Sequence, residues 1–371
     1  MFLRRVYTHI FALTIFVGIS LSSVASESTN HQETTRKPFN AGEFIFEHIG
    51  NSYGWHIMTL GHNEIVCPLP VIALSSTGWH VFMSSEFHHS NTGIVEGLKV
   101  PIEGPNKNHL VEVTASGEEI SPILDISITK NVAALLFSAI LISWIFLTVA
   151  GRYKKNALKA PQGIQSLLEP IILFVRDDIA RPCVGEDRYA KFMPYLLTVF
   201  FFIFINNLLG LVPFLPGGAN VTGNISVALT LAAITFIIIT FSTNKAYWVH
   251  IVNAPGVPWW LKIPLPLMPI VEIMGVITKP VVLMIRLAAN ITAGHIIALG
   301  FVSLIFIFGQ MTPVAGYGTS VLSVTFMIFM MLLELLVAFI QAYVFTMLSA
   351  LYFGMAKVEH QHSAEHAIEH K

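Results

Sequence analysis

The feature that most constrains this chain is a series of long apolar runs. Residues 131–150, NVAALLFSAILISWIFLTVA, contain no charged side chain, and as a helix they can cross the roughly 30 Å hydrocarbon layer of a membrane. Over the whole chain only 12% of residues are charged, against roughly 25% in soluble domains. Backbone in lipid must satisfy its own hydrogen bonds. We therefore expect an all-α polytopic membrane protein.

Four further membrane-embedded elements are expected. The last two form a long hairpin joined by the uncharged GQMTPVAGYGT, and at 1.5 Å per residue the second would be about 54 Å long, so both must tilt or kink. A separate amphipathic run, residues 163–182, fits a helix lying along the inner membrane surface. The four elements span about 192–214, 222–243, 266–309 and 320–355.

Charge placement predicts the orientation. Arg152, Lys154, Lys155 and Lys159 follow the first span directly, which marks that side as cytoplasmic. The N-terminus is then outside and the C-terminus inside. Cys67 and Cys183 fall on opposite membrane faces in this topology and cannot pair within one chain. The formal net charge of −1 gives no field that would attract nucleic acid, so no such partner is expected.

The N-terminal region has two expected parts. Residues 1–26 follow the order of a secretory signal, with Arg4 and Arg5 before an apolar core and small residues, and an uncleaved first helix is the alternative. Residues 27–124 carry β-leaning runs, EFIFEHI, IVCPLPVIAL, GWHVFM and HLVEV, between turn residues. They predict a small β-rich extracytoplasmic domain.

Histidines are frequent at both ends of the chain, but no metal site is predicted. The domain histidines have neither HxxxH nor HExxH spacing, which favours scattered surface and turn positions over metal binding. Residues 358–371 form a His-rich cytoplasmic tail whose histidines lie four apart, as ligands on a helix could, and a frayed terminus is favoured there. The residues concerned are His48, His56, His62, His80, His88 and His89, and His362, His366 and His370.

Arg286 interrupts the first helix of the hairpin. An arginine at the bilayer centre costs between about 2.5 and 17 kcal/mol and cannot lose its proton. On an ideal helix Glu272, Lys279 and Arg286 form one polar stripe about 21 Å long, which Asn290 extends. Small residues surround it and let another helix approach closely, namely Ala288, Ala289, Ala293 and Gly294.

The second helix of the hairpin supplies polar partners at matching depths. Gln341 is nearly level with Arg286, and Glu334 with His295. His295 lies about 180° around its helix from Arg286, whereas Glu334 and Gln341 share a face, so we expect two separate polar zones. An intramembrane His and Glu pair suits a proton path, with a structural hydrogen bond as the alternative. No carboxylate at the depth of Arg286 neutralises it, which points to an anion on a partner.

The segment PIVEIMGVITKPVVLMIRLAANITAGH, followed by LLELLVAFIQAYVFTMLSALYF and preceded by NNLLGLVP, resembles subunit a of the rotary F-type ATP synthases. The resemblance covers about residues 125–357. It implies a membrane stator lying against a ring of c-subunits, with subunit b and the catalytic head as further partners, in a bacterial inner membrane.

By the same resemblance, Arg286 matches the essential stator arginine and Gln341 the glutamine beside it. Asn290, Glu272, Lys279, His295 and Glu334 match polar positions near two aqueous half-channels. His precedes Glu along the chain, as in mitochondrial subunits, whereas many bacterial ones have the reverse order. The chain itself is expected to be non-catalytic and to need no cofactor, because it has no GxxxxGK[ST] phosphate loop.

Two other functions remain open at this point. A free-standing ion channel or secondary transporter would pair Arg286 with the chain's own Glu272 or Glu334, and would conduct ions when purified alone. A ligand sensor would use the hairpin only as an anchor. Protons are favoured over sodium as the coupling ion.

Overall fold

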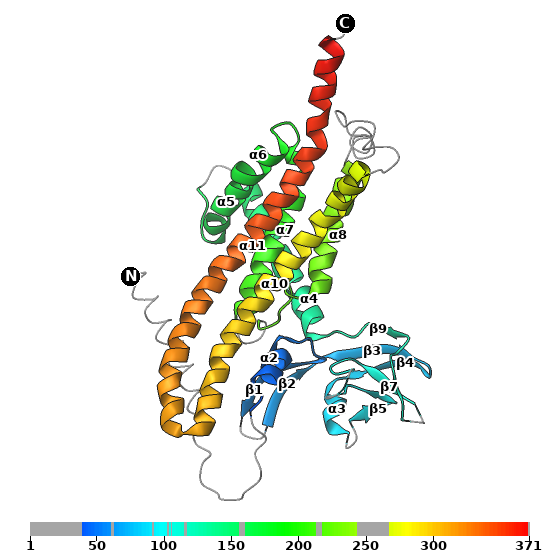
Figure 1. Ribbon diagram of the computed structural model, residues 1–371, viewed down its shortest axis with the longest axis vertical. Coiled ribbons are helices and arrows are strands. Elements are labelled where there is room, and N and C mark those ends of the chain that lie inside the picture. Colours follow the sequence, from blue (N-terminus) through cyan, green and yellow to red (C-terminus); the bar gives the residue numbers. More distant parts are fainter. Residues whose placement is uncertain are drawn as a thin grey trace, which may run out of the picture. The chain divides into compact units, whose positions relative to one another are not determined.

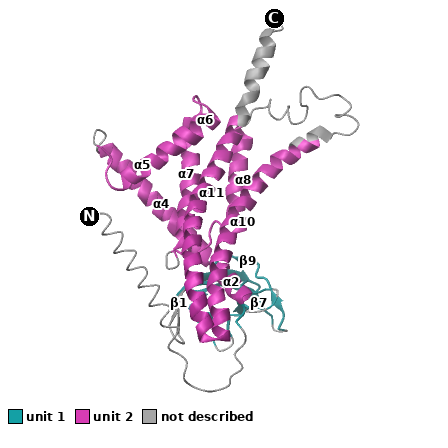
Figure 2. Cartoon of the chain, turned by 60° about the vertical axis from the view of Figure 1, so that its left-hand side comes forward, with its two compact units in different colours: residues 1–40, 52–127 teal, residues 41–51, 128–371 magenta. Residues whose placement is uncertain are grey.

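The computed structural model describes residues 39–60, 63–90, 93–101, 104, 106–114, 117–155, 160–212, 217–242 and 267–369. The predicted signal peptide and Lys159 lie outside these segments. The chain divides into two compact units (Figure 2), the first formed by residues 1–40 and 52–127 and the second by residues 41–51 and 128–371.

The second unit is helical and contains the five predicted spans. Each forms a helix long and apolar enough to cross a membrane. They are α4 (Lys130–Lys155), α7 (Tyr189–Leu211), α8 (Ile225–Ser242), α10 (Leu267–Met311) and α11 (Pro313–Glu369) (Figure 1). The amphipathic run is also helical, as α5 (Ile164–Phe174), a π-helical turn η1 (Val175–Ala180) and α6 (Arg181–Val184).

The turn of the long hairpin is tighter than the sequence predicts. Only Thr312 separates α10 from α11, so the expected linker GQMTPVAGYGT is almost wholly helical. Thr312 caps α11, because its hydroxyl accepts a hydrogen bond from the Ala315 N–H at 3.2 Å, and Pro313 suits the first helical position. A Cβ added at Gly316 would lie 2.8 Å from the Gly309 Cα. The two backbones therefore meet closely at the turn.

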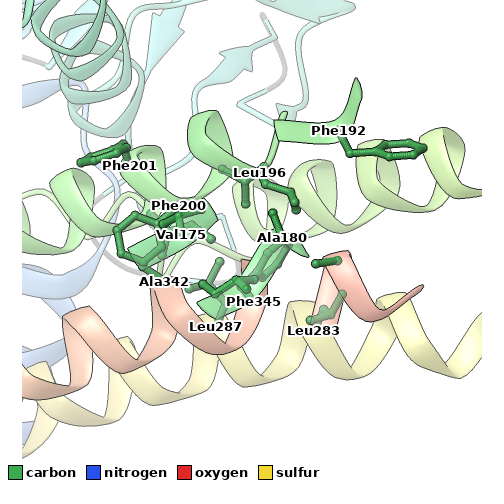
Figure 3. Close-up of a cluster of buried hydrophobic side chains, with 14 of the residues drawn as sticks. Val175, Ala180, Phe192, Leu196, Phe200, Phe201, Leu283, Leu287, Ala342 and Phe345 are labelled. Atoms are coloured by element: carbon green, nitrogen blue, oxygen red, sulfur yellow. The ribbon is translucent and has the colours of Figure 1, made fainter. Parts of the chain in front are cut away.

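The core of the second unit orients α10. Phe200 of α7 is fully buried, and it shares one cluster with Leu283 and Leu287 of α10 and with Ala342 and Phe345 of α11 (Figure 3). Leu283 and Leu287 are one helical turn apart and define the buried side of α10. Residues between them in the sequence, including Arg286, must point elsewhere.

The C-terminal tail differs from expectation. The predicted frayed terminus is wrong, because α11 continues to Glu369. Residues 355–369 contain no glycine or proline to stop the helix.

The run EFIFEHI also differs from expectation. The predicted strand is wrong, because the run forms the helix α2 (Ala41–Ile49). Its Phe44 ring packs against Phe306 of α10 at 6.0 Å, and Lys130 Nζ donates to the His48 carbonyl at 3.2 Å. Tertiary packing and a C-terminal cation favour the helix over the strand pattern.

The first unit is built from three small antiparallel sheets and one short helix. The runs IVCPLPVIAL, GWHVFM and HLVEV all contribute strands, as predicted. The sheets are β1–β2, β4–β3–β9 and β5–β6–β7–β8. Their bounds are β1 (Gly54–Leu60), β2 (Asn63–Pro68), β3 (Pro70–Ser75), β4 (Gly78–Met83), β5 (Ile94–Val95), β6 (Leu98–Lys99), β7 (Val111–Val113), β8 (Glu119–Ile120) and β9 (Leu124–Asp125), and the helix is α3 (Ser85–His89).

Two features hold the sheets β4–β3–β9 and β5–β6–β7–β8 together. The first is a buried core, in which Val71, Ala73 and Phe82 of the sheet β4–β3–β9 pack with Leu98 of β6 and with Leu110, the residue before β7.

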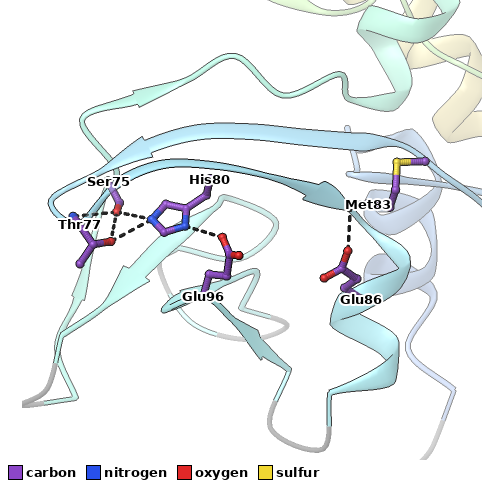
Figure 4. Close-up of polar contacts among 6 residues, drawn as sticks. All are labelled: Ser75, Thr77, His80, Met83, Glu86 and Glu96. Atoms are coloured by element: carbon purple, nitrogen blue, oxygen red, sulfur yellow. Dashed lines mark hydrogen bonds and ion pairs between the residues drawn. The ribbon is translucent and has the colours of Figure 1, made fainter.

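At the β3–β4 turn, His80 is bound on both ring nitrogens (Figure 4). Its Nδ1 lies 2.6 Å from Glu96 Oε2, and its Nε2 lies 2.9 Å from the hydroxyls of Ser75 and Thr77. His80 thus has a structural role at a turn.

Tyr53 links distant segments of the first unit. Its hydroxyl donates to Asp125 Oδ2 at 2.6 Å and accepts from the buried Leu110 N–H at 3.2 Å. Burial, together with the hydrogen bond to Asp125, raises the pKa of the Tyr53 phenol. The neutral phenol is therefore the form that the folded unit needs.

Tyr53→Phe should destabilise the first unit locally, by about 1–3 kcal/mol, because the Leu110 N–H loses its acceptor. Faster amide hydrogen exchange around Leu110 in the full chain would report this loss. Since the folded pKa is raised, the native phenol contributes fully below the usual tyrosine pKa of about 10, and its contribution is lost as pH rises further. The variant should lack that alkaline component. Tyr153→Phe, which removes an exposed phenol contact to Glu169, is the control, and equal exchange in both variants would contradict the assignment.

Candidate functional site

Arg286 lies on an open face of α10. It is exposed, as are Ala289, Asn290 and Ala293, and these positions are three, four and seven residues apart, so they share one side of the helix. Among the described residues, none forms a hydrogen bond or ion pair with Arg286. The side chain of Glu272 lies outside the described residues. The face therefore presents one cation among small residues and an amide.

Gln341 is on the opposite kind of surface. Its side chain is 5% exposed on α11, between the buried Ala338 and Ala342. No described hydrogen bond joins it to Arg286. The structure thus places a buried amide on α11 and an exposed guanidinium on α10.

Glu334 of α11 packs directly against the backbone of α10 at Gly294. A Cβ added at Gly294 would lie 2.6 Å from Glu334 Oε1 and 3.2 Å from its Cδ, both too close for any larger residue without movement. Glu334 Oε1 is buried and has no hydrogen-bond partner among the described residues. Buried polar atoms without partners are few in native proteins. This carboxyl group is therefore an unusual feature of the hairpin.

His295 points to another neighbour. Its Nε2 lies 3.7 Å from where a Cβ on Gly210 of α7 would be. Gly294 and His295 are adjacent, so two successive residues of α10 contact different helices: Gly294 contacts Glu334 of α11, and His295 lies near Gly210 of α7. No described hydrogen bond joins His295 to Glu334. Glu334 instead contacts Gly294, the residue before His295.

A polar network that the sequence analysis missed lies beside His295. The buried Asn207 of α7 donates from Nδ2 to the Ala338 carbonyl at 3.5 Å and accepts from the Thr222 hydroxyl. Asn220 Nδ2 donates to Thr292 Oγ1 of α10 at 3.4 Å. The signal that could have found it is the pair Asn206 and Asn207 within an apolar span, since buried amides in lipid need partners.

Toward the other end of α10, Lys279 meets an aromatic ring. Its Nζ lies 5.3 Å from the Tyr352 ring centroid on α11, a cation–π distance. Lys279 is seven residues before Arg286 and His295 nine residues after it, about 10 and 14 Å along the helix axis. Arg286 therefore stands between two polar regions of the same helical hairpin.

The polar groups of the hairpin suit movement of charge. In the described segments, no group of three His, Cys, Asp or Glu side chains could hold a metal ion. What these segments do provide is an open cation, a buried carboxyl group and a histidine, with amides and hydroxyls around them. Such groups inside a span are characteristic of ion and proton pathways.

Comparison with known proteins identifies relatives over most of the chain. The family model described as ATP synthase A chain matches residues 132–354, and a domain of unknown function matches residues 44–130. ATP synthase subunit a 2 of Chlorobaculum tepidum is 46% identical over 76% of this chain and 75% of its own length. The subunit a proteins of Chloroherpeton thalassium and Myxococcus xanthus are 38% and 40% identical, over 76% and 70% of this chain and 80% and 83% of their own lengths.

Gly294→Ala should fail to gain most of the roughly 1 kcal/mol that alanine gains over glycine in a helix, because the added methyl group would lie 2.6 Å from Glu334 Oε1 and the buried carboxyl group must shift. The melting temperature of the purified chain in detergent would measure this. Gly300→Ala on the same helix is the matched control; its Cβ would meet nothing within 4 Å, and it should gain about 1 kcal/mol of helix propensity. In a Glu334→Ala background this shortfall at Gly294 should disappear. A shortfall that persists there would mean that another group receives the methyl.

Proposed function

The chain belongs to the family of ATP synthase subunit a, and on that premise we propose that Arg286 is the stator cation that faces the carboxylate of each passing c-subunit. Members of this family are the proton-translocating membrane subunit of the F-type ATP synthase, and this chain is one of them. The finer assignment, of a role to each residue, is our proposal. A single observation carries it, namely the open position of Arg286.

The energetics of Arg286 support an external anion. In lipid an arginine costs between about 2.5 and 17 kcal/mol without a partner, and no described residue pairs with it. The exposed Ala289 and Ala293 beside it leave room for another helix to approach closely. A carboxylate carried by that helix would satisfy the guanidinium. Arg286 would in turn stabilise the ionised carboxylate, so that its proton leaves as it arrives.

We further propose that the polar regions on either side of Arg286 line two half-channels. One contains His295, Glu334 and the network of Asn207, Thr222 and Asn220. The other contains Lys279, with Glu272 as a further member by its position on α10. The fixed charge of Arg286 between them opposes direct passage of a cation from one to the other. Gln341, beside the buried Ala338 and Ala342, would help to hold α11 in position against the rest of the helical unit.

Coupling then follows from the energy of moving charge. One elementary charge crossing 100 mV is worth about 2.3 kcal/mol, so several protons per cycle can supply the work of ATP synthesis elsewhere in the complex. Protons must load the rotor from one half-channel and leave by the other. The chain would do no chemistry on the nucleotide itself and would need no cofactor.

The proposed setting is a bacterial inner membrane, with the N-terminus outside and the C-terminus in the cytoplasm. Arg152, Lys154 and Lys155 at the end of α4 support this orientation. The ring of c-subunits, subunit b and the catalytic head are the proposed partners. The segments would be a signal peptide at 1–26, an extracytoplasmic extension at 27–124, a stator domain at 125–357 and a cytoplasmic tail at 358–371.

A free-standing channel is less well supported. That alternative pairs Arg286 with Glu334 or Glu272, whereas Glu334 lies against Gly294. The two functions differ in a simple assay. A stator purified alone and placed in liposomes should not conduct protons, and a channel should.

Arg286→Ala should abolish ATP-driven proton pumping in inverted membrane vesicles, because the rotor carboxylate loses the cation that stabilises its ionised form. Pumping can be followed by quenching of a pH-sensitive dye, and co-purification of c-subunits would verify assembly. Lys155→Ala removes an exposed cation at the end of α4 and should pump normally. Normal pumping in assembled Arg286→Ala complexes would overturn the proposal.

Glu334→Gln should slow passive proton conduction through the membrane sector severalfold after the catalytic head is stripped away. The amide keeps the size of the carboxyl group and cannot exchange a proton near neutral pH. Glu118→Gln, at an exposed position of the first unit, is the matched control. Equal conduction in the two variants would remove Glu334 from the proton path.

A further inference from the structure

One face of the sheet β4–β3–β9 is apolar, and the described residues of the first unit leave most of it exposed. Along β3, Val71, Ala73 and Ser75 are buried, and successive side chains of a strand point to opposite sides. Ile72 and Leu74 therefore point away from the core. Strand pairing sets further residues beside them. We call this set the outer face: Ile72 and Leu74 of β3, Trp79, Val81 and Met83 of β4, and Leu124 and Ile126 at β9.

The outer face is exposed where a soluble sheet would carry polar residues. Trp79 is 60% exposed, Val81 67% and Ile126 53%, and the face contains no charged side chain. Sheets with one side in water normally alternate apolar inward and polar outward residues. A contiguous exposed apolar patch marks a contact with another molecule or with a membrane.

We propose that the outer face rests on the interfacial layer of the lipid bilayer, in the leaflet that α4 enters. Ile126 is part of the face, and α4 begins at Lys130, four residues later. A chain can span at most about 14 Å over four residues, so one edge of the face is tethered close to the point where the chain enters the membrane. The tether therefore keeps the outer face within reach of the bilayer surface.

The chemistry of the face fits the same occupant. Tryptophan prefers the membrane–water boundary, where its ring is in the apolar layer and its N–H meets water. Trp79 and Val81 alternate on one strand and so lie on the same side of it, as a shallow contact with lipid requires. Asp125, between Leu124 and Ile126, belongs to the other side of β9, where it binds Tyr53. The proposal is independent of the roles given to Arg286 and the half-channels.

The test uses the full chain with Cys67 and Cys183 replaced by serine, reconstituted in phosphatidylcholine–phosphatidylglycerol liposomes. A nitroxide spin label is attached through Val81→Cys on the outer face, or through Glu118→Cys between β7 and β8 as a control. Collision with oxygen, which concentrates in lipid, is compared with collision with a water-soluble nickel chelate. The label at position 81 should gain oxygen collisions and lose nickel collisions, and the label at position 118 should do the reverse.

Two other outcomes would each overturn the proposal. A label at position 81 as accessible to nickel as the control would mean that the face is in water. A label shielded from both reagents would mean that protein covers it, either this chain or a second copy of it.

A charge on the outer face gives an independent check. Trp79→Asp should restore nickel collisions to the label at position 81. Ile120→Asp is the control and should not restore them, because Ile120 is also apolar and 52% exposed but lies in the sheet β5–β6–β7–β8. An unchanged spectrum of the label at position 118 would show that the first unit remains folded. Equal effects of the two substitutions would contradict a specific contact of the outer face with lipid.

Discussion

The cost of a guanidinium in lipid is the constraint from which the rest of the helical unit follows. A guanidinium carries a fixed positive charge, and no described residue forms a hydrogen bond or ion pair with Arg286. The apolar packing of α10 makes this position possible, because Leu283 and Leu287 hold one side of the helix in the core. The cation is therefore turned outward by the same contacts that stabilise the fold. In the function that we propose, a carboxylate of a neighbouring subunit supplies the anion that this position lacks.

The glycines of the helical unit are as important for its packing as its charged side chains. Gly294 leaves the space that Glu334 fills, and Gly210 leaves the space beside His295. In both places a titratable group of one helix lies against the bare backbone of another. Such contacts bring helices close together in lipid, and they keep the polar groups at fixed depths. The packing of these helices and the positions of the two titratable groups thus depend on the same glycines.

The sequence predicts the framework well and the contacts less well. Long apolar runs identify all five spans, because backbone in lipid must satisfy its own hydrogen bonds and a helix does so within one segment. The sequence predicts a linker over GQMTPVAGYGT, whereas the structure turns at Thr312 alone. The difference arises because the capping of α11 by Thr312 and the close approach of Gly309 and Gly316 depend on tertiary structure. EFIFEHI is rich in residues that favour strands, yet it forms a helix that packs against Phe306. The network around Asn207 joins α7, α10 and the segment before α8, and no local pattern shows which elements meet.

The single-residue turn at Thr312 makes the long hairpin intolerant of changes in length. Every residue of α10 and α11 is positioned by its count from that point, since a helix advances 1.5 Å and about 100° per residue. One inserted residue between Gly294 and Thr312 would rotate Gly294 by about 100° around the helix axis and turn it away from Glu334. Deletions within these helices should therefore be harder to accommodate than many substitutions. A change of length outside these two helices would leave that count, and the contact between Gly294 and Glu334, unchanged.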